Sequence, residues 1–428
     1  MALGVLTGLN VLNYVDRYVA AAVLPLILAA LSLSDAEGGL VQSAFIVSYS
    51  LVSPLVGWVA DRRARLPLAT VGVLVWSAAT VGSGLAPTFA LLLVARAIIG
   101  VGEASYAVVT PPLLSDFYPP DQRGRALAIF YAAIPAGTAL GYVLGGAIGP
   151  TLGWRAAFLV AGLPGTVLGL TLLTIREPAR GTFDSATARR GTPLALGASL
   201  RALGARRSYV YNTAAQVIYT FAMGGLATWM PTYFVRERHI PLASAASTFG
   251  LLLVVAGFGG TLLGGQLGDR LAGRLRAAPF AVSGWGLIGS LGFTALAVLS
   301  PTPAIFWPSM FVTLFLLFLN IGPLNAAMAN VLPPDLRGRG FALTTMAIHL
   351  LGDAASPWVI GAVSDRTGLT TPVLATGLLL GVSGLVLLIG RGALERDVAV
   401  VAPASAPAVD GDPIPDPGRS GPVGERLG

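Results

Sequence analysis

Long apolar segments recur along the whole chain, separated by short segments that hold most of the charged residues. A helix needs roughly 20 residues, at about 1.5 Å per residue, to cross about 30 Å of hydrocarbon. By this criterion we place twelve spans at 2–31, 38–60, 66–86, 88–114, 125–149, 155–175, 208–235, 244–268, 277–300, 303–330, 338–363 and 371–391. No segment alternates apolar and polar residues as a lipid-facing barrel strand does. We therefore predict an all-α integral membrane protein.

Composition and charge placement agree with this prediction. The chain is 54% hydrophobic and 11% charged, whereas a soluble domain carries roughly 25% charged residues. All 27 basic residues are arginine, and 21 of them fall on one side of the membrane when both termini are placed there. The positive-inside rule makes that side the cytoplasm. We expect a multi-pass protein of the inner (plasma) membrane with both termini cytoplasmic, and no nucleic-acid partner, because topology explains the net charge of +7.

The residues that build metal, redox or hydrolytic sites are scarce. The chain has no cysteine and only two histidines, His239 and His349, far apart in the sequence. This excludes disulfides and thiolate metal sites and disfavours zinc or haem. The chain has no G-x-S-x-G, H-E-x-x-H or P-loop motif, and its loops are too short to build an enzyme site. We expect no cofactor, no metal and no enzymatic activity.

The sequence repeats itself after half its length. The segments 57–65 (G-W-V-A-D-R-R-A-R) and 265–274 (G-Q-L-G-D-R-L-A-G-R) follow the second and eighth spans, and the P-P-D-x-R-G-R segments 119–125 and 333–339 precede the fifth and eleventh. Such a repeat indicates a duplicated six-helix unit. We predict two bundles, 1–175 and 208–391, a cytoplasmic linker at 176–207, and a disordered cytoplasmic tail at 392–428 whose composition cannot bury a core.

This duplication, with a G-x-x-x-D-R-x-x-R loop after the second and eighth spans, resembles the major facilitator superfamily over residues 2–391. The glycines would let helices approach closely, and the acids could pair with the arginines or cap a helix. The resemblance implies a cytoplasmic gate between the halves, although plain topogenic charge is the alternative. The gate residues are Gly57, Asp61, Arg62, Arg65, Gly265, Asp269, Arg270 and Arg274. The second copy departs from the pattern, since Gly273 takes the place of the third arginine.

Away from the ends of the predicted spans lie five charged residues, together with His349: Asp16, Arg17, Arg96, Glu103 and Asp353. Facing lipid, five charges would cost on the order of 15 kcal/mol, so we expect them to face the bundle interior. Adjacent residues diverge by about 100° around a helix, so Asp16 and Arg17 each need a partner on another helix. Arg96, Gly100 and Glu103 share one helical stripe, and His349 and Asp353 are spaced as an i, i+4 pair. Structural ion pairs or a proton site would both fit.

Five blocks narrow the resemblance. They are N-Y-V-D-R-Y (13–18), R-A-I-I-G-V-G-E-A-S-Y (96–106), F-Y-A-A-I-P-A-G-T-A-L-G-Y-V-L-G (130–145), R-R-S-Y-V-Y (206–211) and H-L-L-G-D-A-A-S-P-W-V-I-G-A-V-S-D-R (349–366). Together they resemble the Spinster (Spns) branch, including its bacterial members. The resemblance implies a secondary active transporter of lysophospholipid or sphingosine phosphate, with proton coupling and alternating access. Organic-anion transporters share N-Y-x-D-R, so a proton-coupled carrier of small organic anions or drugs is the alternative.

The resemblance also implies roles for the buried charges. We expect Asp16 to accept a proton, Glu103 to pair with Arg17, and Arg17 to meet an anionic headgroup once Glu103 releases it. We expect Arg96 to neutralise or orient Asp16 or Glu103.

The remaining candidates are less constrained. His349 and Asp353 are secondary titratable candidates, for which a packing pair is the alternative. Glycines and prolines interrupt the seventh and tenth spans, as in helices that line a cavity. We expect a substrate cavity lined by Asn13, Tyr14, Tyr106, Tyr219, Trp229 and Asn320. The expected partners are an amphipathic substrate, protons and membrane lipids, and we expect the chain to act as a monomer.

Overall fold

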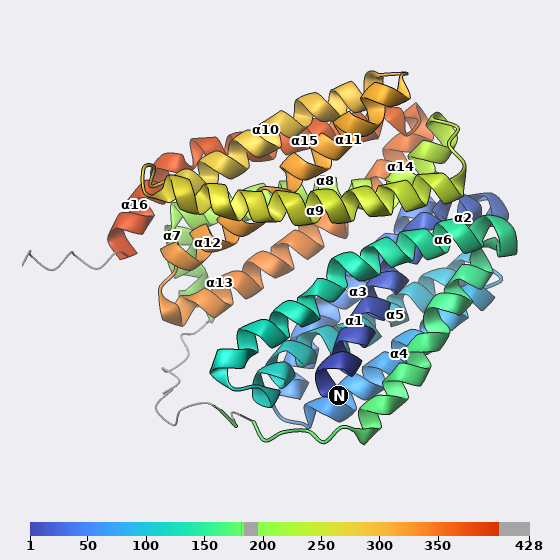
Figure 1. Ribbon diagram of the computed structural model, residues 1–428, viewed down its shortest axis with the longest axis horizontal. Coiled ribbons are helices and arrows are strands. Elements are labelled where there is room, and N and C mark those ends of the chain that lie inside the picture. The colour runs from blue at the N-terminus through green and yellow to red at the C-terminus, as the bar shows by residue number, and fades with distance from the viewer. Residues whose placement is uncertain (181, 184–195, 402–428) are drawn as a thin grey trace, which may run out of the picture.

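The computed structural model describes residues 1–180, 182–183 and 196–401, which are almost entirely helical. The first group of helices is α1 (Ala2–Ala22), α2 (Leu24–Leu31), α3 (Asp35–Ala60), α4 (Arg65–Leu85), α5 (Phe89–Phe117) and α6 (Pro120–Thr171), followed by a 3-10 turn at Leu172–Thr174. The second is α7 (Leu196–Ala205), α8 (Arg207–Glu237), α9 (Leu242–Ala272), α10 (Ala278–Leu299), α11 (Pro303–Phe318), α12 (Ile321–Val331), α13 (Pro334–Ala347), a π-helix at Ile348–Asp353, α14 (Ser356–Thr367), α15 (Thr370–Ile389) and α16 (Arg391–Val401). Figure 1 shows the two groups as two bundles packed side by side.

Each predicted span lies in a helical region, which confirms the all-helical membrane fold. Within the described residues, nine helices are long and apolar enough to cross a membrane, or ten if α1 and α2, bent by 52°, form one span. The predicted spans at 125–149 and 155–175 both fall in α6, which turns at Gly153 (φ 85°, ψ 159°), a conformation that glycine adopts without strain. The predicted span at 208–235 lies in α8, which is not among the nine.

The structure adds a helix within the predicted linker and corrects the start of the predicted tail. The helix α7 lies within the predicted linker, and α16 occupies the start of the predicted disordered tail. The prediction of disorder is wrong for 392–401, because Leu394 is only 1% exposed in the core of the second bundle. In addition, Asp397 accepts hydrogen bonds from the backbone N–H and hydroxyl of Ser208 and so caps the start of α8. Residues 402–428, and 181 and 184–195 of the linker, lie outside the described residues.

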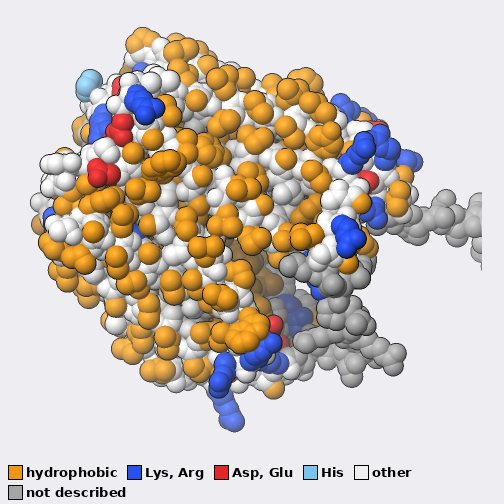
Figure 2. Space-filling model, turned by 180° about the vertical axis from the view of Figure 1, so that it is seen from behind, with side chains coloured by type: hydrophobic (Ala, Val, Ile, Leu, Met, Phe, Trp, Pro, Cys, Tyr) orange, Lys and Arg blue, Asp and Glu red, His pale blue; other side chains and the backbone are white. Residues whose placement is uncertain are grey.

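The helices begin and end at two opposite faces of the molecule. We call one the Asp35 face, where the chain turns at 31–35, 85–89, 237–242, 299–303 and 367–370, and the other the linker face, where it turns at 60–65, 117–120, 272–278 and 331–334. Figure 2 shows hydrophobic side chains over most of the surface between the faces, with charged side chains gathered toward the edges. This distribution is typical of a protein embedded in a bilayer.

The two bundles meet at the Asp35 face and separate toward the linker face. In Figure 1, α6 and α9 converge at the Asp35 face and diverge in the other direction. Between α3 and α14 the backbones touch, since a Cβ atom added at Gly361 would lie 2.2 Å from the Asp35 carbonyl oxygen and one at Gly39 2.2 Å from that of Pro357. Figure 2 shows a hollow between the bundles on the linker side. The molecule is therefore closed at the Asp35 face.

Candidate functional site: a buried charge cluster between the two bundles

A buried ion pair joins α1 to α5. The Nε of Arg17 donates to Oε2 of Glu103 at 2.7 Å. The Glu103 side chain has no solvent exposure and that of Arg17 is 17% exposed. The pairing of these two residues agrees with the prediction. Because Arg17 keeps some exposure while Glu103 has none, the arginine is the member of the pair that a ligand can reach.

Three aromatic rings surround the Arg17 guanidinium. Its central carbon lies 5.0 Å from the ring centres of Tyr14 and Phe45 and 4.9 Å from that of Tyr49, within the range of cation–π attraction. The two rings on α3 can come this close because α5 carries Gly100, where a Cβ atom would lie 2.3 Å from the Phe45 carbonyl oxygen. These rings attract the guanidinium through its face, so its N–H groups stay free to form hydrogen bonds.

Asp16 lies beside this pair in sequence but faces another helix. Its Oδ2 accepts a hydrogen bond from the Thr80 hydroxyl at 3.2 Å, and its Oδ1 is buried without a hydrogen-bond partner. The residue is 1% exposed. Within the described residues no ion pair joins Asp16 to a cation. A buried carboxylate without a cationic partner is energetically costly in its charged form, which suits a group that gains and loses a proton.

Arg96 forms its hydrogen bonds with α3. Its Nε donates to the Val41 carbonyl oxygen at 3.2 Å, and its terminal nitrogen Nη2 donates to Oε1 of Gln42 at 2.9 Å. One terminal nitrogen is buried without a partner. The expectation that Arg96 neutralises or orients Asp16 or Glu103 stays a prediction, because the hydrogen bonds of this fully buried side chain go to a carbonyl and an amide of α3.

A small cavity connects this cluster to the second bundle. It has a volume of about 70 Å³, and its lining includes Arg17 and Gln42 from the first bundle and Thr228 and Asp353 from the second. A space of this size holds a few water molecules but no lipid. The predicted His349–Asp353 pair is confirmed, with Nδ1 3.0 Å from Oδ2 on the π-helix. The cavity thus places a second acid opposite Arg17.

Two of the predicted cavity residues belong to the packed core instead. Tyr106 is fully buried, and its hydroxyl donates to the Leu6 carbonyl oxygen within the first bundle. Trp229 is also fully buried, and its Nε1 donates to the Pro357 carbonyl oxygen at 2.9 Å. Both predictions are wrong because these side chains satisfy their polar atoms on backbone carbonyls and fix helix packing.

Of the other residues predicted to line the substrate cavity, Asn13 and Tyr14 lie in the first bundle and Tyr219 and Asn320 in the second. Tyr14 lies at the Arg17 site, and the neighbouring Asn13 is 1% exposed with its amide nitrogen unpaired. Tyr219 is 9% exposed, and Asn320 donates to the Leu317 carbonyl oxygen at 2.5 Å where α11 gives way to α12. Neither Tyr219 nor Asn320 lines the cavity beside Arg17.

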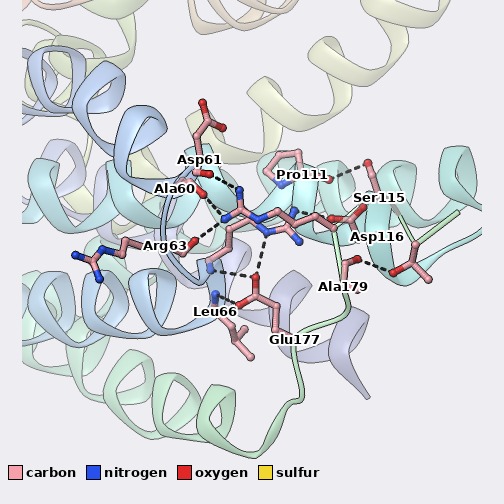
Figure 3. Close-up of polar contacts among 12 residues, drawn as sticks. Ala60, Asp61, Arg63, Leu66, Pro111, Ser115, Asp116, Glu177 and Ala179 are labelled. Carbon is pink, nitrogen blue, oxygen red and sulfur yellow. Dashed lines mark hydrogen bonds and ion pairs between the residues drawn. The ribbon is translucent and has the colours of Figure 1, made fainter. Parts of the chain in front are cut away.

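At the linker face, Arg65 pairs within its own bundle. It lies 2.6 Å from Asp116 and 3.2 Å from Glu177, and the Glu177 carboxylate also accepts the backbone N–H of Arg65 and Leu66 at 3.1 and 2.9 Å (Figure 3). Burial acts to raise the pKa of Glu177, but the hydrogen bonds from Leu66 and Arg65 outweigh it and hold that pKa below its ordinary value. Glu177 therefore caps the start of α4 as a carboxylate.

The end of α3 is held by the same segment. The Arg180 guanidinium donates to the carbonyl oxygens of Ala60 and Arg63, both at 2.5 Å, and of Asp61 at 2.7 Å (Figure 3). A cation at a helix C-terminus satisfies carbonyls that lack intrahelical donors. Asp116, Glu177 and Arg180 were not among the predicted site residues, although an acid and a base next to the end of the sixth span are a usable signal.

The predicted gate pairs are not formed across the two bundles. Arg62 donates to the Trp58 carbonyl oxygen at 2.9 Å and lies over the Trp58 ring, while Asp61, Asp269, Arg270 and Arg274 are exposed. In the part of the chain that the structure describes, no ion pair joins the two loop copies, because the bundles are apart at this face. Nor does Gly57 permit a close approach here, since an added Cβ atom would meet only Val108 at 3.8 Å. An added Cβ atom at Gly265 would meet nothing within 4 Å.

Comparison with known proteins agrees with this architecture. A sequence model of the Major Facilitator Superfamily matches residues 6–357. Protein spinster homolog 1 from Homo sapiens is 35% identical, over 86% of this chain and 73% of the human protein. The chain belongs to the Spinster family of this superfamily. The sphingosine-1-phosphate transporter SPNS2 from Danio rerio is 32% identical, over 85% of this chain and 76% of the relative.

A solved structure shares the fold of this Spinster-family chain. It is the crystal structure of a bacterial homolog to the human lysosomal transporter Spinster, in an inward-facing and unoccupied conformation. The TM-score is 0.85 at 23% sequence identity, over 92% of this chain and 97% of the other. This likeness shows the shared fold, and the transport activity is that of relatives such as the Danio rerio protein SPNS2.

In this Spinster-family chain, the Asp35 face is closed by a cluster that sequence analysis missed. The Asp35 carboxylate accepts from Arg236 at 2.6 Å and from the Ser364 hydroxyl at 2.6 Å. The Asp365 carboxylate accepts hydrogen bonds from the backbone N–H groups of Asp35 at 2.7 Å and Ala36 at 3.0 Å. These contacts join α3 to α8 and α14, across the two bundles. The available signal was two acids, each next to the end of a predicted span.

Proposed function

We propose that this protein is a secondary active transporter that moves an amphipathic anion of the lysophospholipid or sphingosine-phosphate type, coupled to protons, by alternating access of one central site. The observation that carries the proposal is the buried Arg17–Glu103 pair beside a cavity shared by both bundles. The Danio rerio relative SPNS2 is a sphingosine-1-phosphate transporter, which supports this substrate class.

Arg17 is the group we assign to the anionic headgroup. Its guanidinium is held by aromatic rings and by one carboxylate, and it lines the cavity. A phosphate can replace Glu103 as its partner, because an arginine forms charge-assisted hydrogen bonds equally with carboxylate and phosphate. The apolar side chains beside it in the cavity, Phe45 and Ile46 among them, offer the start of a surface for the lipid tail.

Proton coupling follows from competition for Arg17. When Glu103 is charged it holds the guanidinium, and when it takes up a proton the ion pair loses most of its attraction and Arg17 is free to bind the headgroup. Asp16, buried next to this pair without a cation, is the group we assign to deliver or receive that proton. His349 and Asp353, on the opposite wall, are secondary proton carriers in this scheme.

The two faces supply the alternation. Closure at the Asp35 face and separation of the bundles toward the linker face expose the central site to one side. The arginine-rich linker face is assigned to the cytoplasm by the positive-inside rule, so this conformation is inward-open. The two bundles, 1–175 and 208–391, act as the rocking units, and the exposed loop copies at 57–65 and 265–274 come together as the cytoplasmic gate when the linker face closes.

The test is uptake by the purified protein in proteoliposomes under an imposed pH gradient. Labelled lysophospholipid and a labelled hydrophilic organic anion are compared in the same preparation. We expect gradient-driven uptake of the lysophospholipid and its loss in Arg17→Gln. Uptake of the organic anion alone would reject the lipid substrate and favour a carrier of small anions or drugs.

A further inference from the structure

A proline in α8 leaves a backbone carbonyl without its helical donor. In an α-helix the carbonyl of residue i accepts from the N–H of residue i+4. The residue four positions after Ala227 is Pro231, which has no N–H. The Ala227 carbonyl oxygen is therefore free to accept a bond from elsewhere, in a helix that lines the central cavity.

The donor comes from the other bundle. The hydroxyl of Tyr142, on α6, donates to the Ala227 carbonyl oxygen at 2.5 Å. Tyr142 is fully buried, and its ring packs edge-on against Phe249 and 5.2 Å from the ring centre of Tyr18. One hydroxyl thus satisfies a carbonyl that the chemistry of its own helix leaves unpaired.

The bond lies in the tight part of the seam between α6 and α9. A Cβ atom added at Gly250 would lie 2.9 Å from the Tyr142 side chain, and one at Gly146 2.9 Å from Ala246. Farther along α9 toward the linker face, Gly257 and Gly260 contact Phe318 and Phe315 of their own bundle instead. Tyr142 therefore lies near the point where the bundles begin to separate, as Figure 1 shows for α6 and α9.

We infer that Tyr142 is a positioning residue for the transport cycle: its hydrogen bond to the carbonyl freed by Pro231 holds the bundles together on the Asp35 side of the cavity and sets the population of that closed state. The inference rests on the proposed alternation between two open states. When the Asp35 face opens, α6 moves away from α8 and the Ala227 carbonyl loses its donor, which Pro231 cannot replace. Losing one buried hydrogen bond of this kind changes a two-state population by about fivefold.

The test uses distances between spin labels on the full-length protein, which has no cysteine of its own. Ala90→Cys on α5 and Ala304→Cys on α11 place labels at exposed positions of the Asp35 face, one on each bundle. Pulsed electron paramagnetic resonance then gives the distance distribution without cargo. In Tyr142→Phe we expect the longer-distance population to rise about fivefold relative to the parent.

A second variant tests the same hydrogen bond from the side of its acceptor, and a third serves as a control. Pro231→Ala restores an N–H that can return to Ala227 within α8, so it should shift the distribution in the same direction. Tyr106→Phe is the matched control, because it removes a buried hydroxyl bonded to the Leu6 carbonyl inside one bundle. It should leave the distances unchanged.

An unchanged distribution in both Tyr142→Phe and Pro231→Ala would overturn the inference, and so would an equal shift in Tyr106→Phe. These distances are measured without substrate. The inference therefore fails or holds independently of whether lysophospholipid is the cargo.

Discussion

Arg17 Nε and Glu103 Oε2 lie 2.7 Å apart, although the residues are 86 positions apart in sequence and sit on different helices. The glutamate is fully buried, and the arginine has three aromatic rings around it. The two charges are therefore unequal in what they lose when separated. Arg17 keeps favourable surroundings, whereas Glu103 is left as a buried charge without the cation that it was bonded to.

This inequality predicts the outcome of a double-mutant cycle. Arg17→Gln should lower the free energy of unfolding by about 3–5 kcal/mol, since it leaves an unpaired buried carboxylate. Glu103→Gln should cost less, because the rings still face Arg17. The double variant should recover most of the loss. Thermal unfolding of the detergent-purified protein measures all four, and additive losses would show that the pair is not coupled.

The closure of the Asp35 face predicts a change in cavity access. Asp365→Ala removes the acceptor for two backbone N–H groups of α3, so the closed state should lose population by about tenfold. A cysteine at Thr228, which is 3% exposed and lines the cavity, reports this. In Asp365→Ala, an impermeant maleimide added outside intact cells should label this cysteine about tenfold faster than in the parent.

The control for this labelling is Asp269→Ala, which removes an exposed acid at the opposite face. It should not speed the reaction. Equal labelling rates in the parent and in Asp365→Ala would show that this carboxylate does not keep the Asp35 face closed.

The Glu177 cap predicts a pH-dependent contribution to stability. Its pKa is held below the ordinary value, so the folded protein binds this proton more weakly than the unfolded chain. The stabilisation is complete above the unfolded pKa, about 4.3, and is lost as the pH falls through the lower folded pKa. Glu177→Gln should therefore cost about 1 kcal/mol at pH 7 and progressively less below pH of about 4.

Unfolding temperatures across this pH range measure the effect. Glu395→Gln, on α16, is the comparison, since Glu395 makes no ion pair in the described residues. A difference between Glu177→Gln and the parent that persists unchanged into acid would contradict the role of the charge.

Sequence patterns were sufficient for the helical spans and for the burial of the charges. Unpaired backbone groups and charges are both costly in the hydrocarbon core of a bilayer. This cost alone requires spans of about 20 residues and requires Asp16, Arg96 and Glu103 to face the protein interior. The His349–Asp353 pair was predictable for a similar reason, since i, i+4 spacing places both on one helix face. The partner of Arg17 came from family resemblance rather than from spacing.

Contacts between helices were much harder to predict. Tyr106 and Trp229 look the same in sequence whether they line a cavity or fill a core, and only the carbonyls they reach distinguish the two. Arg96 shares its bundle with Asp16 and Glu103, but its hydrogen bonds go to a carbonyl and an amide of α3. The closure at Asp35 depends on backbone groups of α3, which no side-chain pattern reports.

We propose that protons drive transport through the buried acids of the first bundle. The most direct measurement is lysophospholipid uptake into proteoliposomes, with and without an imposed pH gradient, for the parent protein and Asp16→Asn. The substitution keeps the shape of a buried side chain that accepts a hydrogen bond from Thr80. We expect the gradient to accelerate uptake by the parent and to have no effect on uptake by Asp16→Asn. Equal acceleration of both by the gradient would contradict it.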